Sequence, residues 1–263
     1  MSRQNYYKGR SVRERLSVDQ ALVLELVRRE RATQPRLGGR KLLYRIGPEL
    51  EKAGVSIGRD RFLELLKREG LLVVRARSAC RTTDSRHGFR VYPNLARDLV
   101  LSGPHQLLVS DITYIRTLEG FMYVSLVMDG WSRAIVGHDA SDSLEMEGAL
   151  RAVGKAVAQL PKGHQAMHHS DRGCQYCCGA YIQRLLEHGL RISMTQENHC
   201  YENAKAERLN GILKQEYGLG QTFIAKSQVA GAVHEAVSLY NNCRPHTALG
   251  YSTPMQAHVR QAA

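Results

Sequence analysis

The segment most informative about the fold of this chain is Leu107-Leu108-Val109-Ser110-Asp111-Ile112-Thr113-Tyr114-Ile115. Apolar and β-branched residues dominate the stretch, which predicts a strand. One acid, Asp111, interrupts it, and an unpaired charge in a central strand is costly. We therefore expect this acid to have a function that offsets its cost.

Two further strands are predicted directly after it, at 121–129 and 133–138, and the short turns between the three indicate an antiparallel meander. Helices and short strands then alternate, with helices expected at 144–159, 179–188, 203–217 and 226–241 and strands at 167–170 and 191–194. An antiparallel start followed by alternation predicts an α/β fold, with a mixed sheet and helices on both of its sides.

The N-terminal part of the chain is expected to be helical, with helices at 17–31, 39–46 and 60–69. Gly47-Pro48 should break or kink the second helix, and Pro48 can begin a new turn that reaches Ala53. In the third helix Phe62, Leu65 and Leu66 should face inward, with Gly70 as its C-cap. Helix, short turn and basic helix are the outline of a helix-turn-helix domain. A plain helical bundle with a solvated basic face is the alternative.

Charge is distributed unevenly along the 263 residues. Residues 1–100 contain 23 Lys and Arg against 11 Asp and Glu, whereas residues 101–263 contain 14 of each, so the whole surplus of +12 lies in the first hundred. This asymmetry favours a DNA-binding role for the helical part over a basic surface without a specific partner.

We expect three regions: a helix-turn-helix-like region at 1–74, a basic linker at 75–104 and a catalytic core with a C-terminal helix at 105–263. The linker is either laid along a phosphate backbone or a solvated connector, and the sequence does not separate the two. Its arginines are Arg75, Arg77, Arg81, Arg86, Arg90 and Arg97.

Other sequence features limit the cellular setting. No apolar run is long enough to span a bilayer, and residues 1–8 contain no apolar core of a secretory signal. We therefore expect a cytoplasmic protein with reduced thiols, with no membrane partner and associated with the nucleoid through DNA.

One segment resembles a zinc cluster, because Cys174, Cys177 and Cys178 follow His168 and His169 closely. No second pair of ligands follows at the spacing of a zinc finger, so zinc is not expected.

Two further acids stand out beside Asp111. Asp171 closes the short strand at 167–170, and Glu207 lies in the first turn of the helix at 203–217. Carboxylates from two neighbouring strands and a helix can converge on divalent metals, and two such metals support phosphoryl transfer on nucleic acid. Lys214 lies two helical turns after Glu207 on the same face, where it either contacts a phosphate or faces solvent. Taken singly, Asp129, Asp139 and Asp142 are expected to be caps or surface residues.

Three longer motifs carry a family resemblance. They are His169-Ser170-Asp171-Arg172-Gly173-x-Gln175-Tyr176, Ser193-Met194-Thr195 followed by Cys200-Tyr201-Glu202-Asn203-Ala204-x-x-Glu207, and Tyr240-Asn241-x-x-Arg244-Pro245-His246-x-x-Leu249-Gly250-Tyr251. Together with Ser110-Asp111-Ile112-Thr113-Tyr114-Ile115, they resemble the second-frame (OrfB-type) transposase of the third insertion-sequence family. The resemblance is strong over about 100–258 and looser in the N-terminal helices.

The resemblance implies a ribonuclease-H-like, five-stranded core of the retroviral-integrase type with Asp111, Asp171 and Glu207 as catalytic and metal-binding acids. It further implies cleavage at transposon ends that depends on two Mg²⁺ ions, with Mn²⁺ as a substitute, and joining of the freed 3′-hydroxyl to target DNA. The residues that we expect to contact DNA are Lys214, Arg40, Arg59, Arg61, Lys67, Arg68, Arg172, Lys205, Arg208, Arg244 and His246.

The chain departs from the family pattern at Glu202, where aspartate is usual, and at Cys174, where serine is usual. The expected partners are terminal inverted repeats, target DNA, further copies of the chain and an upstream-frame (OrfA-type) partner or fusion. A catalytically silent DNA-binding regulator and a nuclease of RNA–DNA hybrids are the alternative functions, because the fold alone does not fix the function.

Overall fold

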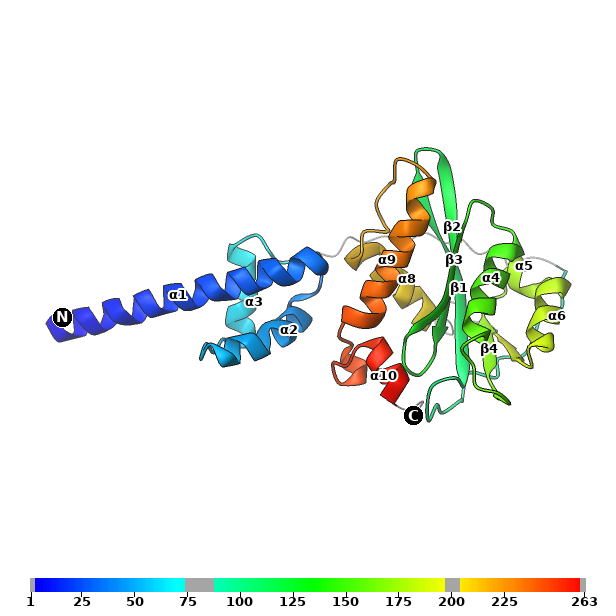
Figure 1. Ribbon diagram of the computed structural model, residues 1–263, viewed down its shortest axis with the longest axis horizontal. Coiled ribbons are helices and arrows are strands. Elements are labelled where there is room, and N and C mark those ends of the chain that lie inside the picture. Colours follow the sequence, from blue (N-terminus) through cyan, green and yellow to red (C-terminus); the bar gives the residue numbers. More distant parts are fainter. Residues whose placement is uncertain (1–2, 74–87, 197–203, 261–263) are drawn as a thin grey trace. The chain divides into compact units, whose positions relative to one another are not determined.

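The computed structural model describes residues 3–73, 88–196 and 204–260 of the chain, with side chains from residue 18 onward. The chain divides into two compact units, Met1–Arg75 and Ala76–Ala263 (Figure 1). Arg75, Arg77, Arg81 and Arg86 of the expected linker, together with Cys200 and Glu202, lie outside the described residues.

The first unit consists of helices α1 (Arg3–Thr33), α2 (Gly39–Lys52) and α3 (Arg59–Arg68). The predicted inward positions of α3 are confirmed, because Phe62, Leu65 and Leu66 are buried. The predicted break at Gly47-Pro48 is wrong, since α2 continues through Pro48 to Lys52. Leu42, Ile46 and Leu50 form one buried stripe along α2, and burial of this stripe offsets the backbone hydrogen bond that proline cannot donate.

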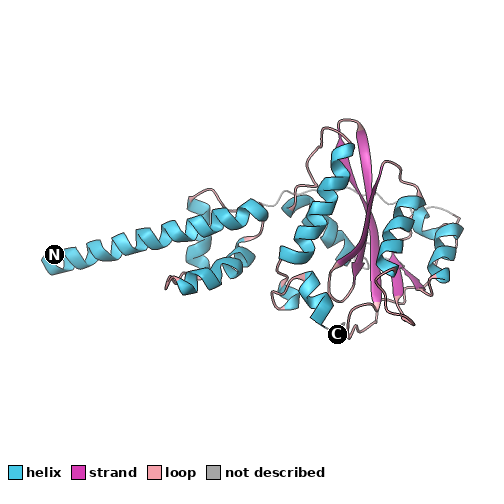
Figure 2. Cartoon of the chain, in the orientation of Figure 1, coloured by secondary structure: helices cyan, strands magenta, loops and turns pink. Residues whose placement is uncertain are grey.

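The second unit is built on a five-stranded mixed sheet, as predicted (Figure 2). The strands are β1 (Leu107–Thr117), β2 (Gly120–Asp129), β3 (Ile135–Ser141), β4 (Met167–Ser170) and β5 (Arg191–Met194), in the spatial order β3-β2-β1-β4-β5. The predicted antiparallel meander is confirmed for β1, β2 and β3. β4 runs parallel to both of its neighbours, β1 and β5.

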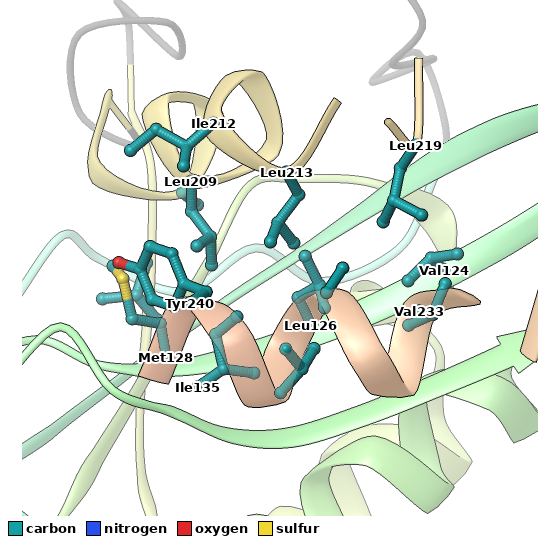
Figure 3. Packing of buried hydrophobic residues seen from close by; sticks show 14 of the residues in the cluster. Val124, Leu126, Met128, Ile135, Leu209, Ile212, Leu213, Leu219, Val233 and Tyr240 are labelled. Carbon is teal, nitrogen blue, oxygen red and sulfur yellow. The ribbon is translucent and has the colours of Figure 1, made fainter. Parts of the chain in front are cut away.

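Helices cover both faces of this sheet (Figure 1). One face carries α4 (Met146–Val157), α5 (Cys174–Cys177) and α6 (Gly179–Glu187), and the other carries α8 (Ala204–Glu216) and α9 (Ser227–Cys243). In Figure 3, Leu209 and Leu213 of α8 point toward strand residues such as Leu126. On the opposite face α4 lies so close to β3 that a Cβ on Gly137 would come within 2.1 Å of the Ala152 carbonyl oxygen. Only glycine allows this approach.

Part of the segment before β1 packs on the sheet. The Met194 amide donates to the Pro93 carbonyl oxygen at 3.3 Å, and Ser193 Oγ accepts from the amides of Leu95 and Ala96. Tyr92 and Leu101 pack against the two apolar clusters of this unit. Residues 92–101 are therefore attached to the core through β5 and its neighbours.

A short helix that the sequence analysis did not anticipate, α10 (Pro254–Arg260), follows a 3-10 turn at Thr247–Leu249. Its buried His258 meets Ser132 of the β2–β3 turn, with 2.9 Å between His258 Nδ1 and Ser132 Oγ. The same turn is organised by Asp129, whose carboxylate accepts from Ser132 Oγ and from the amides of His105, Trp131 and Ser132. Asp129 therefore caps this turn while being fully buried.

Within the described parts of the chain, every helix is too short or too polar to cross a membrane.

Candidate active site

The pairing of β1 with β4 sets the positions of the two predicted aspartates. The strands are parallel and in register from Leu107↔Met167 to Val109↔His169. Asp111 and Asp171 each follow two residues after that last pair, so the two acids reach the same edge of the sheet. β4 ends at Ser170, and the chain then turns as the Gly173 amide donates to Asp171 Oδ1 at 3.0 Å.

Helix α8 brings the third acid across this edge. Ala206, Leu209 and Leu213 bury its apolar face, which fixes its rotation over the sheet. Glu207, Asn210 and Lys214 then share a neighbouring face, at the spacing of one turn and two turns. Asn210 Nδ2 donates to Asp111 Oδ2 at 2.7 Å, so this helix is tied directly to β1 at the predicted acid.

The three carboxylates lie within one electrostatic environment. Burial raises the pKa of Asp111 to about 8, and the charges of Asp171 and Glu207 add to this rise. The Ile112 amide and Lys214 act in the opposite direction. Burial, followed by the charge of Asp171, also raises the pKa of Glu207. Crowded carboxylates of this kind are tolerated when a cation lies among them.

Carboxylate oxygens are the hard ligands that Mg²⁺ and Mn²⁺ prefer, so the donor set of Asp111, Asp171 and Glu207 fits such ions. Across residues 3–73, 88–196 and 204–260, however, no three His, Cys, Asp or Glu side chains are grouped tightly enough to ligate an ion as they lie. Glu207 is exposed in the first turn of α8.

The side chain of Lys214 packs against Tyr114, which forms an aromatic pair with Phe121. Its Nζ lies 4.8 Å from the centroid of the Tyr114 ring, at cation–π distance. The Phe121 ring meets Tyr114 edge to face, with 5.5 Å between the centroids. The ammonium of Lys214 therefore lies against an aromatic surface, and its charge lowers the pKa of Asp111.

Behind the aspartates, on the opposite face of β1 and β4, lies a buried polar group. His168 is 1% exposed, and its Nε2 lies 3.0 Å from the Tyr181 hydroxyl. The Tyr176 ring packs on both residues, with centroid distances of 6.0 Å to His168 and 5.4 Å to Tyr181. Burial, with a smaller effect from His169, lowers the pKa of His168 to about 3.

The predicted DNA contacts of the first unit are all exposed, namely Arg40, Arg59, Arg61, Lys67 and Arg68. Two of them have acidic neighbours, since Arg59 pairs with Asp60 at 2.8 Å and Arg68 pairs with Glu69 at 3.1 Å.

The predicted contacts of the second unit differ in their surroundings. Arg208 is exposed on α8. Arg172 Nε donates to the Thr195 carbonyl oxygen at 2.6 Å, which ties the turn after Asp171 to the end of β5. Lys205 Nζ donates to the Gly130 carbonyl oxygen at 3.3 Å, and burial lowers its pKa.

Arg244 and His246 take part in the interior of the protein. Arg244 is 2% exposed, and its guanidinium binds both carboxylate oxygens of Glu216, at 2.7 and 2.8 Å. Its third nitrogen, Nη1, lies 2.8 Å from His246 Nε2. The expected DNA contact by Arg244 is therefore wrong in this structure, because a buried ion pair consumes its donors. In the same motif, the amide of Asn241 exchanges two hydrogen bonds of 2.9 Å with the backbone of Ile135 in β3.

Asn210 is a site residue that the sequence analysis missed. Its Oδ1 is buried and has no hydrogen-bond partner among the residues that the structure describes, while its Nδ2 donates to Asp111. The signal was present in the sequence, because Asn210 follows Glu207 by three residues and precedes Lys214 by four.

This geometry agrees with what is found among known proteins. Residues 102–200 match the integrase core domain family, and residues 188–254 match a second family of the same description. The fold is similar to that of a chain in the cryo-EM structure of the simian T-cell lymphotropic virus intasome in complex with PP2A regulatory subunit B56 gamma. The TM-score is 0.51 and the identity 17%, over 84% of this chain and 70% of that one. The class is thus that of the polynucleotidyl transferases with an integrase core.

Curated relatives narrow the class to one family. The chain is 32% identical to the insertion element IS600 uncharacterized 31 kDa protein of Shigella sonnei, over 97% of this chain and 93% of that protein. It is 33% identical to transposase InsF for insertion sequence IS3A of Escherichia coli K12, over 83% of this chain and 77% of InsF. The chain belongs to the IS3 family of insertion-sequence transposases and is a DNA transposase.

Proposed function

We propose that Asp111, Asp171 and Glu207 are the catalytic acids of this transposase and that together they bind two Mg²⁺ ions, for which Mn²⁺ substitutes. The observation that supports this most is the coupling of the three carboxylates at one sheet edge, where the charges of Asp171 and Glu207 both act on Asp111. A bound metal pair supplies an activated nucleophile and stabilises the leaving oxygen of an in-line displacement.

The residues of this chain prepare two displacements. In the first, a water oxygen bonds to the phosphorus at the end of the insertion sequence, and the bond from phosphorus to the 3′-oxygen breaks. In the second, the freed 3′-hydroxyl bonds to a target phosphorus, and the target 3′-oxygen leaves. Asn210 holds Asp111 for both, and we assign to Lys214 the neutralisation of phosphate charge, which its place on the same helix face as Asn210 supports.

We further propose that the first unit binds the terminal inverted repeats and that the basic surplus of residues 1–100 supplies much of the affinity. Two transposon ends have to be brought together, so we propose an oligomer of this chain on DNA. An upstream-frame partner stays a prediction.

The test is Mg²⁺-dependent nicking and strand joining on a duplex that carries the element's own end. We expect Asp111→Ala, Asp171→Ala and Glu207→Ala each to abolish both reactions, because each removes a metal ligand. Asp142→Ala, which changes an exposed acid outside the site, is the matched control and should react as the parent protein does.

Undiminished activity of Asp171→Ala would overturn the assignment of the acids. DNA binding without nicking by the unaltered protein would favour the regulator, and cleavage of RNA–DNA hybrids without any joining would favour the nuclease.

A further inference from the structure

β1 extends past its pairing with β4 on the side where the acids lie. β4 is in register with β1 only from Leu107 to Val109, whereas β1 continues to Thr117. At the far end of β1, Phe223 forms a bridge with Thr117. Lys214, which belongs to the helix on one face of the sheet, reaches the ring of Tyr114 between these two pairings. The helix face that carries Glu207 and Asn210 is therefore connected to the aromatic pair of Tyr114 and Phe121 through this lysine.

A lysine ammonium is a point charge on a flexible stem, and fixing it costs side-chain entropy. A ring face that already holds the ammonium reduces this cost when a ligand binds. Tyr114 provides such a face at 4.8 Å, and Phe121 braces Tyr114 from the neighbouring strand at 5.5 Å. Asn210, one helical turn before Lys214, donates to Asp111 Oδ2 at 2.7 Å, so Lys214 projects from the helix face that meets this acid.

We propose that Tyr114, braced by Phe121, is a positioning residue that holds the ammonium of Lys214 in place for the contact with a phosphodiester of the cleaved DNA strand that the proposed function assigns to this lysine. Lys214 contacts the phosphate, and Tyr114 is a positioning residue. The inference rests on the proposed function, since it takes DNA to be the ligand of this sheet edge.

The experiment measures binding of the full chain to a labelled duplex of random sequence, without divalent ions, over a series of salt concentrations. A phosphate contact carries no sequence information, so random DNA suffices and no catalysis is needed. The variants are Tyr114→Phe, Tyr114→Leu, Lys214→Gln and the double variant Tyr114→Leu/Lys214→Gln. Tyr123→Leu, at the position paired with Tyr114 in β2, controls for damage to the sheet.

Tyr114→Leu should weaken binding by about two- to fivefold, the range that a cation–π contact at an exposed site supports. Lys214→Gln should lower the slope of log affinity against log salt by about one, as expected for a lost phosphate contact. Tyr114→Leu should lower this slope in the same direction, and it should weaken binding no further when Lys214 is already replaced. Tyr114→Phe, which keeps the ring, and Tyr123→Leu should bind as the parent protein does.

Equal weakening by Tyr114→Leu with and without Lys214 would overturn the proposal, because Tyr114 would then act independently of the lysine. An affinity of Tyr114→Phe as low as that of Tyr114→Leu would also overturn it. Failure of the proposed function would appear separately, as activity that survives replacement of the acids while these binding results stand.

Discussion

At the scale of single residues, Asn210 shows how the site depends on a neutral side chain. It donates to Asp111 Oδ2 at 2.7 Å from the same helix face that carries Glu207 and Lys214. Removing a partner that orients a metal ligand typically lowers metal affinity or activity by about 10- to 100-fold. We expect Asn210→Ala to lose Mg²⁺-dependent nicking to this extent while keeping its fold.

The measurement is the nicking rate over a range of Mg²⁺ concentrations, with circular dichroism to check folding. Gln215→Ala, on the same helix, is the control and should match the parent protein. Parental rates in Asn210→Ala at low Mg²⁺ would show that the hydrogen bond to Asp111 has no part in holding the ion.

His168 gives the fold a dependence on pH. Its pKa is about 3 in the folded protein and about 6.5 in the unfolded chain, so between these values only the unfolded chain takes up the proton. The contribution of His168 to the free energy of unfolding is therefore fully present above pH 6.5 and is lost as the pH falls toward 3. Between pH 7 and pH 5 we expect His168 to account for a loss of about 2 kcal/mol in the free energy of unfolding.

Urea denaturation at the two pH values measures this loss. His168→Gln should show a smaller difference between them than the parent protein, whereas His188→Gln, at the end of α6, should keep the full difference. Identical pH dependence in the parent protein and His168→Gln would contradict the assignment.

The three acids were singled out because Asp111 interrupts an apolar strand, Asp171 ends one, and Glu207 lies in the first turn of a helix within a specific motif. Asn210 was overlooked although it shares a helix face with Glu207 and Lys214, because its role becomes evident only when its partner Asp111 is located. Arg244 shows the converse error. Its motif led to the prediction that Arg244 contacts DNA. Its actual partner is Glu216, which lies 28 positions earlier in the sequence and on another helix. Contacts between residues that are far apart in the chain are the feature that is hardest to predict from a single sequence.

At the scale of elements, the short strands β4 and β5 were predicted at their observed bounds, since apolar runs ended by polar turns are a local signal. The break at Pro48 was a wrong prediction because packing of a buried stripe outweighed the local preference of proline.

Helix α10 carries a sequence signal that was overlooked. Thr253 Oγ1 accepts from the Gln256 amide, and Gln256 Oε1 accepts from the Thr253 amide, which is a capping box with proline at the first helical position.

The attachment of α10 through His258 can be tested on its own. His258→Ala removes one hydrogen bond of buried Ser132 Oγ, which keeps Asp129 and the Ala134 amide as partners, and it removes a buried ring. We expect a loss of about 1–3 kcal/mol in the free energy of unfolding. Val259→Ala changes the neighbouring side chain, which is 58% exposed, and should alter stability by less than about 0.5 kcal/mol. Equal urea midpoints for the two variants would show that the contact between His258 and the β2–β3 turn does not stabilise the fold.

At the scale of the whole molecule, the charge asymmetry predicts how DNA binding responds to salt. The surplus of +12 lies in residues 1–100, and each phosphate that a basic residue neutralises releases counterions. We expect the affinity of the full chain for random duplex DNA to fall steeply as the salt concentration rises, with a slope of log affinity against log salt well below −1.

Replacing Arg40, Arg61 and Lys67 together by glutamine should flatten this slope. The matched change at Lys155, Lys162 and Arg191, which are exposed on the second unit, should leave it almost unaltered. A larger effect of the second set would place the main DNA-binding surface on the catalytic unit.

The turn between β2 and β3 has a practical consequence. It contains Trp131, the one tryptophan of the 263 residues, and it touches the start of α8, where Lys205 donates to the Gly130 carbonyl oxygen. Glu207 lies two residues further along that helix. The protein therefore carries its own fluorescent residue beside the helix that presents Glu207, and the proposed metal site predicts that the intrinsic fluorescence changes when Mg²⁺ is added, without any label.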